Sequence, residues 1–217
     1  MLNSSSRQRG VTLIELMVAV TLVALVMMLA LPSFSEAMQN RQIRSAAESI
    51  RSGLQAARTE ALRRNRLVTF QMQTGTGWQI GCDTVDATVD ANGEQACPAL
   101  IQKRDPNEGT SQATVDLGKV VASTGAASAS PVFSGSARFS PLGRVDVPAG
   151  ASCTPAGIAT GCPLGGDNAT FLVKNPTGGA CQTGGGKMRC LQISLSATGQ
   201  VRMCDPAVTT PGDPRLC

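Results

Sequence analysis

Residues 7–15, RQRGVTLIE, decide the fold of this chain. A short, polar and basic leader ends at Gly10, and an apolar run follows at once to Leu31, interrupted by one charge, Glu15. A secretory signal peptide carries its small-residue cleavage site after the apolar region, which is then removed. Nothing resembling that site follows here, where the sequence continues PSFSE over 32–36. We therefore predict cleavage directly after the glycine, which leaves the apolar segment on the mature protein.

This arrangement resembles the class III leader of type IV pilins and of the pseudopilins of type II secretion. The matching residues are Gly10, 12–15 and Pro32, whereas Val11 stands where most family members carry phenylalanine. The resemblance implies that a prepilin peptidase cuts after Gly10 and methylates the new N-terminus at Val11. It also implies two further partners, namely other minor pilins or pseudopilins and an inner-membrane assembly platform.

The apolar segment 11–31 is long enough to cross a bilayer as a helix, so membrane lipid is an expected partner. At about 1.5 Å per residue it spans roughly 31 Å, close to the thickness of a hydrocarbon core. Arg7 and Arg9 precede it and favour a cytoplasmic N-terminus, although Arg41 and Arg44 beyond it weaken the charge asymmetry. We expect a single-pass inner-membrane protein with a periplasmic C-terminal domain.

Glu15 places a carboxylate within this segment. An acid at mid-membrane costs about 2.5–3.5 kcal/mol on insertion scales, and less near an interface. In one interpretation, Glu15 simply reaches the headgroups. In the other, which the pilin resemblance implies, it neutralises the α-amine of Val11 on a neighbouring subunit. Two charges that are otherwise unpaired in lipid would give the incoming subunit its register.

Pro32 lies within a longer helical pattern. Proline removes one backbone hydrogen bond and bends a helix. A simple helix stop is the alternative, but apolar spacing resumes beyond Pro32, so we predict a kink or a locally melted turn. From about Glu36 to about Arg64, apolar and small residues recur on one face with a period of 3.6: Ile43, Ala46, Ala47, Ile50, Leu54, Ala57 and Ala61.

The end of this amphipathic helix is rich in arginine. Arg63, Arg64 and Arg66 place cations at the C-terminal end, which suits the helix dipole. They indicate a solvated helix end, with a nucleic-acid patch as the alternative. The run 57–65, AR-x-EA-x-x-RN, resembles one branch of the pilin family, which holds pseudopilin H and the FimT and FimU minor pilins.

The remainder of the chain, 67–217, predicts a β-rich periplasmic domain. We expect a hairpin from 67–72 and 77–80, an irregular polar stretch at 83–114, loops at 149–168 and 178–187, and further strands at 115–122, 131–134, 137–143, 169–174, 190–196 and 200–204. The resemblance implies the α+β lollipop of pilins. Its parts are a leader (1–10), a transmembrane helix half (11–33), an amphipathic half (34–66) and a β-sandwich or curled sheet.

The chain has eight cysteines, all after Gly81. An even count in an exported chain indicates disulfides. The absence of C-x-x-C pairs and of histidine argues against a metal site. Eight cysteines allow 105 connectivities, and the simplest is sequential, each bridge contributing about 2–3 kcal/mol. The predicted pairs are Cys82–Cys97, Cys153–Cys162, Cys181–Cys190 and Cys204–Cys217.

Composition excludes several functions. Without histidine, Ser-His and Cys-His catalysis are excluded, and we find no other nucleophile–base pair or carboxylate dyad. The prediction is a non-enzymatic protein without a cofactor. The net charge of +4, part of which lies in the leader, is too weak to indicate nucleic acid by itself. One tryptophan, five phenylalanines and no tyrosine are a poor stock for base stacking.

We therefore predict a structural filament subunit. The first interpretation is a minor pilin in type IV pilus assembly, located at the filament tip, because bulky disulfide-bonded loops would crowd a regular lattice. The second is pseudopilin H of the type II secretion system, where a subunit near the tip has the same freedom.

The third interpretation is a binding protein for DNA uptake. FimT-like proteins that bind DNA carry a Gly-Arg-x-Arg motif, and the corresponding stretch here is 199–202, GQVR. Its Arg202 matches, but a glutamine replaces the first arginine, which removes a phosphate contact. Arg144, Lys187 and Arg189 could compensate if the fold brings them together.

Overall fold

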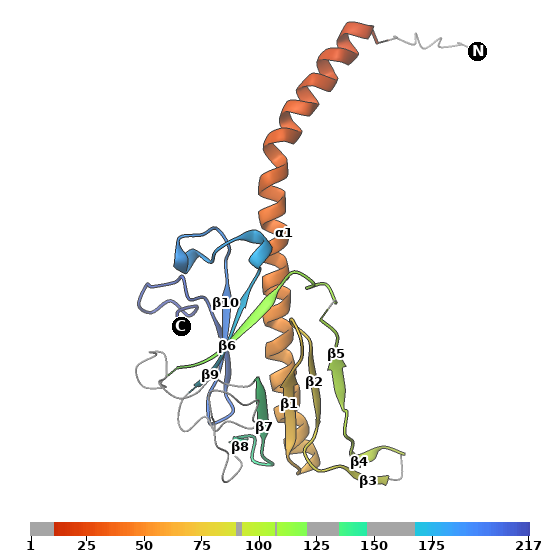
Figure 1. Ribbon diagram of the computed structural model, residues 1–217, viewed down its shortest axis with the longest axis vertical. Coiled ribbons are helices and arrows are strands. Elements are labelled where there is room, and N and C mark those ends of the chain that lie inside the picture. Colours follow the sequence, from red (N-terminus) through yellow and green to blue (C-terminus); the bar gives the residue numbers. More distant parts are fainter. Residues whose placement is uncertain (1–10, 90–92, 107, 121–134, 147–167) are drawn as a thin grey trace, which may run out of the picture. The chain divides into compact units, whose positions relative to one another are not determined.

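The computed structural model describes residues 11–89, 93–106, 108–120, 135–146 and 168–217. The chain forms two compact units, divided between Met38 and Gln39. One helix, α1 (Leu13–Arg64), belongs to both units, and the strands follow it in the sequence (Figure 1). The predicted α+β class, with a long N-terminal helix and a β-rich C-terminal domain, is confirmed.

Within the described ranges, the strands of the second unit form antiparallel sheets. The larger sheet has the order β5 (Gln102–Arg104), β2 (Trp78–Cys82), β1 (Val68–Met72), β7 (Ser136–Phe139) and β8 (Val145–Asp146). The next has the order β11 (Val201–Cys204), β10 (Leu191–Leu195), β9 (Asn168–Lys174) and β6 (Thr114–Val120). A separate pair consists of β3 (Asp86–Val89) and β4 (Gln95–Cys97).

The predicted hairpin is confirmed, since β1 and β2 pair with Met72 opposite Trp78. Its turn contains Gly75 at φ +69°, a conformation that glycine adopts without strain. The prediction of irregular structure at 83–114 is wrong, because β3, β4, β5 and the first residue of β6 lie there.

Several other predicted segments can be placed. The loop predicted at 178–187 contains the short 3₁₀ turn η2 (Gln182–Gly184), and η1 (Pro176–Gly178) begins just before it. The strand predicted at 131–134 and most of the loop predicted at 149–168 lie outside the described residues.

α1 ends in a recognisable cap. Asn65 adopts the left-handed conformation, with φ +51°, and asparagine is one of the few residues that tolerate it. The Arg66 amide then donates to the Ala61 carbonyl at 3.3 Å, which satisfies one of the last free carbonyls of the helix. The predicted end near Arg64 is confirmed.

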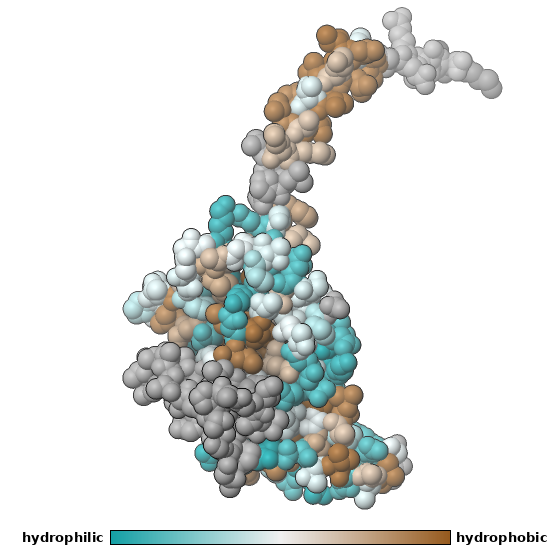
Figure 2. Space-filling view, viewed as in Figure 1, coloured by the Kyte–Doolittle hydropathy of each residue, from teal (hydrophilic) through white to brown (hydrophobic). Residues whose placement is uncertain are grey.

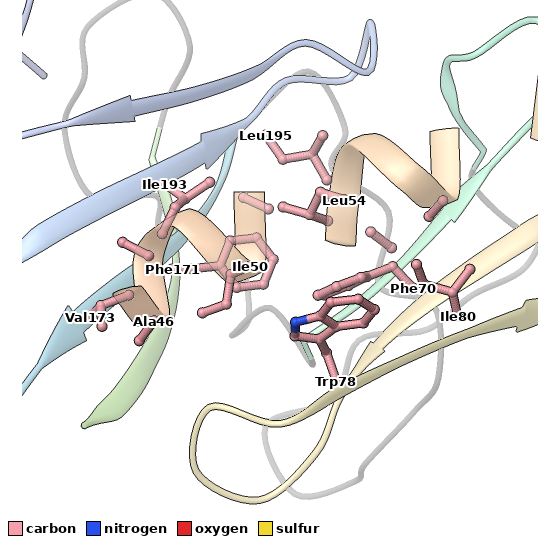
Figure 3. Packing of buried hydrophobic residues seen from close by; sticks show 14 of the residues in the cluster. Ala46, Ile50, Leu54, Phe70, Trp78, Ile80, Phe171, Val173, Ile193 and Leu195 are labelled. Carbon is pink, nitrogen blue, oxygen red and sulfur yellow. The ribbon is translucent and has the colours of Figure 1, made fainter. Parts of the chain in front are cut away.

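The core of the second unit is built on one face of α1 (Figure 3). All seven apolar or small residues predicted for this face are fully buried. Ile50 and Leu54 lie between side chains of the two larger sheets, such as Phe171 of β9 and Phe70 of β1. Burial of each such large side chain contributes about 1.5–3 kcal/mol. The alternation in β9 and β10 places Phe171 and Ile193 on the same buried side.

Trp78 makes the most specific contact of the helix. Its indole Nε1 donates to Ser49 Oγ at 2.9 Å, which pairs the one polar atom of a nearly buried side chain. Gly53 lies one turn further along α1, where a Cβ would lie 2.9 Å from ring carbons of both Phe70 and Trp78. The two rings therefore require a glycine on the helix at this position.

We expect Gly53→Ala to destabilise the protein by about 1–3 kcal/mol, because the added methyl group overpacks the two rings. On helix propensity alone, the same change would stabilise it by about 1 kcal/mol. The sign therefore tests the packing, and unfolding in urea followed by the fluorescence of Trp78 measures it. Gln55→Ala, at an exposed position of the same helix, is the control and should be near neutral. A stabilised Gly53→Ala variant would contradict this packing.

Candidate assembly segment and docking surfaces

The first turn of α1 contains the acidic residue predicted to act in assembly. The Glu15 backbone N–H donates to Thr12 Oγ1 at 3.4 Å, so Thr12 is the N-cap and Glu15 the N3 residue of a T-x-x-E pattern. The carboxylate lies where the helix dipole favours negative charge. The cap at Thr12 was not predicted, although the T-x-x-E pattern over 12–15 carries its signal. Val11 is exposed, and Gly10 lies outside the described residues.

The described side chains from 11 to 28 are all exposed. Most of them are apolar, and Figure 2 shows this segment largely in brown on the face in view. Leu13 and Met28, near its ends, each expose 76% of their surface. A helix that is apolar all round needs apolar surroundings.

The hydropathy of this segment and the course of the helix at Pro32 bear on two of the predictions. Within the part of the chain that the structure describes, no helix combines the length and the hydropathy of a membrane span. The backbone at Pro32 belongs to α1, so the helix does not stop there, while the bend at Pro32 stays a prediction.

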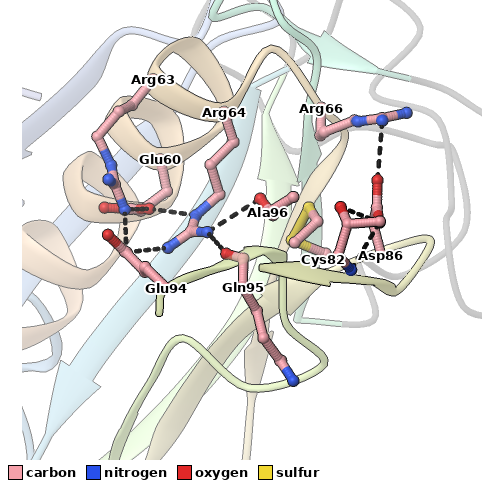
Figure 4. Close-up of a disulfide and its surroundings, with 11 residues drawn as sticks. Glu60, Arg63, Arg64, Arg66, Cys82, Asp86, Glu94, Gln95 and Ala96 are labelled. Carbon is pink, nitrogen blue, oxygen red and sulfur yellow. Dashed lines mark hydrogen bonds and ion pairs between the residues drawn. A yellow bond between two sulfur atoms is a disulfide. The ribbon is translucent and has the colours of Figure 1, made fainter. Parts of the chain in front are cut away.

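The C-terminal end of α1 holds the β3–β4 pair, which we call the arm (residues 83–89 and 93–97), through Arg64 (Figure 4). The Arg64 guanidinium donates to Glu60 at 2.7 Å, to the Gln95 and Ala96 carbonyls at 2.7 and 3.0 Å, and to Glu94 at 3.0 Å. Its side chain is only 7% exposed. Arg64 is therefore a structural clamp between the helix and the arm.

The neighbouring arginines are also paired. Arg63 contacts Glu60 at 2.9 Å and Glu94 at 3.0 Å, and Arg66 contacts Asp86 of β3 at 3.1 Å. The hydrogen bond from Arg63 lowers the pKa of Glu94. The predicted helix end rich in arginine thus binds the chain's own carboxylates, which weighs against a nucleic-acid patch here.

Disulfides secure the arm and two other segments. Cys82 of β2 is bonded to Cys97 of β4, which joins the arm covalently to the larger sheet. Cys181–Cys190 and Cys204–Cys217 are also present, as the sequential scheme has them. The fourth predicted pair, Cys153–Cys162, lies outside the described residues. Each of the three bridges among the described residues joins cysteines no more than 15 residues apart and so closes a local loop.

Two of the residues considered for DNA binding hold internal contacts. Arg202 donates to the Pro214 and Leu216 carbonyls at 3.3 and 2.8 Å, and so fixes the C-terminal loop. Arg189 forms an ion pair at 2.7 Å with Asp205, which is buried. Both guanidinium groups are therefore engaged within the chain.

The structure does not gather the four cations at one place. Arg144 lies at the turn between β7 and β8, where the Val145 amide donates to Ala197 just after β10. Lys187 and Arg189 precede the other end of β10. Five residues of extended strand separate the two groups by roughly 16 Å. Compensation for the missing arginine by a local cluster is therefore not supported.

The described residues contain no group of three or more histidine, cysteine, aspartate or glutamate side chains placed to hold a metal ion. The arrangement that the structure does show consists of paired charges, disulfides and exposed apolar surfaces.

Comparisons with known proteins define the class of the chain. The family model of the prokaryotic N-terminal methylation motif matches residues 5–31, which places the chain among the prepilin-type proteins. The family model described as Type II transport protein GspH matches residues 46–199, most of the chain. The chain belongs to this GspH family.

Two solved structures are also similar to this chain. In two crystal forms, the type IV minor pilin FimU of Pseudomonas aeruginosa is similar to this chain. One has 19% identity and a TM-score of 0.43, with 79% of this chain and 94% of that chain covered. The other has 20% identity and a TM-score of 0.41, with 78% and 97% covered. No curated protein matches.

We expect Arg64→Gln to loosen the arm, because glutamine cannot bind the two carboxylates and the two carbonyls at once. Hydrogen bonds to a charged group contribute about 1.5–3 kcal/mol. Amide hydrogen exchange over residues 93–97 should therefore accelerate more than tenfold. Arg51→Gln, at an exposed position of the same helix, is the control. Unchanged protection in Arg64→Gln would show that the disulfide alone holds the arm.

We also expect the arm to loosen in acid. The Arg63 hydrogen bond lowers the pKa of Glu94, and for Glu60 burial raises the pKa but the bonds from Arg63 and Arg64 lower it further. A carboxyl whose pKa is lowered by folding stabilises the fold fully above its ordinary value, 4.5, and loses that contribution as the pH falls through the folded pKa.

Protection of residues 93–97, corrected for intrinsic exchange, should stay constant from about pH 7 to pH 5 and fall below about pH 4.5. Glu94→Gln should flatten this dependence. An identical pH profile in wild type and Glu94→Gln would contradict the assignment.

Proposed function

We propose that this chain is a structural subunit of a pilin-type filament. It is processed after Gly10, anchored in the inner membrane by its N-terminal helix, and incorporated into the filament through that helix. The observation that supports this most strongly is the exposed apolar surface of 11–28, with Glu15 as its one charge, inside an N-terminal methylation motif. Lipid covers such a surface before assembly, and neighbouring helices cover it afterwards.

The second unit suits a low-copy subunit near the tip of a type IV pilus. Its arm carries exposed Val85 and Val89, and its loops are closed by disulfides. These additions occupy space that a regularly repeated subunit would need for its neighbours. The exposed arm and the disulfide-closed loops are the observations that support this role.

A second candidate is pseudopilin H of the type II secretion system. The description of the family that covers 46–199 favours this role. A DNA-binding role has less support, since Arg202 and Arg189 are engaged within the chain. A deletion strain separates the three candidates through sheared surface pili, secreted exoproteins and transformation.

We expect Glu15→Ala to insert normally in the membrane but to be depleted more than tenfold from sheared filaments. Leaving one member of a buried charge pair without its partner costs about 3–5 kcal/mol. The measurement is immunoblotting of membrane and filament fractions after complementation of the deletion strain. Thr21→Ala, a polar change in the same helix, is the control. Normal incorporation of Glu15→Ala would contradict the proposed assembly role.

A further inference from the structure

Arg58 differs from the other arginines near the end of α1. Arg63, Arg64 and Arg66 each bind a carboxylate. Arg58 is partly buried, its Nε atom has no hydrogen-bond partner, and no ion pair joins it to a carboxylate in the described part of the chain. A buried donor left unpaired costs free energy, so its position calls for an explanation. Arg58 also belongs to the run 57–65 that resembles the pilin branch.

Two turns meet over this side chain. A Cβ on Gly143, between β7 and β8, would lie 3.0 Å from Arg58 Nε, and one on Gly199, between β10 and β11, would lie 3.4 Å from it. Both glycines have positive φ, at +71° and +79°. A Cβ on Gly199 would also collide with the Gly143 carbonyl oxygen. Glycine at both positions therefore lets the two sheets close on Arg58.

Exposed apolar side chains surround this junction. Leu142, beside Gly143 at the tip of the turn, is 79% exposed, and Leu62 of α1 is 49% exposed. The Leu62 methyl groups lie 3.5 Å from the position of a Cβ on Gly143. Arg144, on the other side of Gly143, is exposed and has no carboxylate partner among the described residues. We call Arg58, Leu62, Leu142 and Arg144 the docking patch.

The turn that presents the docking patch is fixed in shape. The Gly143 amide donates to the Ser140 carbonyl at 2.8 Å, and the Ser140 amide donates to the Arg144 carbonyl at 2.8 Å. These bonds close the backbone around Leu142, whose side chain is exposed. A preformed surface of this kind loses little entropy when a partner binds.

We propose that the docking patch binds a carboxylate that lies on an apolar surface of a neighbouring pilin-type subunit. This inference rests on the proposed filament function. Charge complementarity carries it, because Arg58 and Arg144 lack a carboxylate within the described chain, whereas Arg63, Arg64, Arg66 and Arg138 each have one. The two leucines displace water from the contact, and an arginine–carboxylate hydrogen bond strengthens when water is excluded.

A nucleic-acid phosphate is the alternative ligand. Binding of a strand needs several cations along a track and, usually, aromatic side chains on which bases stack. The docking patch has two arginines and two leucines, and Lys187 and Arg189 lie at the other end of β10. These side chains favour a protein carboxylate.

Photo-crosslinking of the full chain in cells tests this proposal. A benzophenone amino acid at position 142 should form an adduct with another pilin-type subunit, which mass spectrometry identifies together with the crosslinked peptide. Arg144→Glu should reduce the adduct about tenfold or more, as expected for replacing a charge-assisted attraction by repulsion. Arg51→Glu, on the exposed face of α1, should not reduce it.

A compensating charge reversal on the partner then identifies the acid that Arg144 contacts. Changing the acid nearest the crosslink on the partner to arginine should restore the adduct to Arg144→Glu. Because Arg144 is exposed, its substitution leaves the fold intact, which Trp78 fluorescence verifies. Arg58→Gln should reduce the adduct as well, and it is interpreted only where the same fluorescence shows a folded chain.

Three results would overturn the proposal: an adduct with a pilin-type subunit that is insensitive to Arg144→Glu, an adduct with nucleic acid or with a protein of another class, or no adduct at all from chains that enter filaments. The filament fractions of wild type and Glu15→Ala report separately on the proposed function. Glu15-dependent incorporation without an Arg144-dependent adduct therefore rejects the docking patch and keeps the filament role. Incorporation independent of Glu15 rejects the proposed assembly role whatever the adduct shows.

Discussion

The rest of the second unit depends on the contact of one face of α1 with its two larger sheets. This face carries small residues, which let both sheets approach the helix closely: Ala46, Ala47, Gly53, Ala57 and Ala61. Larger side chains at Ile50 and Leu54 then join residues of both sheets in one buried cluster. Trp78 makes this contact specific, because its Nε1 atom donates to Ser49 Oγ while its ring carbons pack against Gly53.

The arm, which lies outside this core, is secured by interactions other than apolar burial. The arm is a two-stranded pair, which has marginal stability by itself. Its Val85 and Val89 are more than half exposed, so apolar burial does not secure it. Instead, the Arg64 clamp and the Cys82–Cys97 bridge do so. The chain thus combines an apolar core around α1 with a periphery held by paired charges and disulfides, and peripheral surfaces of this type remain available to partners.

The predictions that the structure confirms are those with a periodic signal. The buried face of α1 follows the 3.6-residue period, and the β1–β2 hairpin follows alternation around a glycine turn. The strands within 83–114 are short, and their partners are distant in sequence: Arg64 binds β4, and β5 pairs with β2, so local patterning did not predict them. The surroundings of Arg58 are formed by two turns that meet only in the folded chain, so the sequence did not predict them. Whether Arg202 is free to contact DNA or holds the C-terminal loop likewise depends on partners that meet it only in the folded chain.

The central claim is that the apolar N-terminal helix stays on the mature protein as the assembly element. The most direct test is the mass of the N-terminal peptide of the protein purified from membranes. The account predicts a peptide that begins at Val11 and carries one additional methyl group on its α-amine. A peptide that retains the leader, or a mature chain that begins after Leu31, would contradict it.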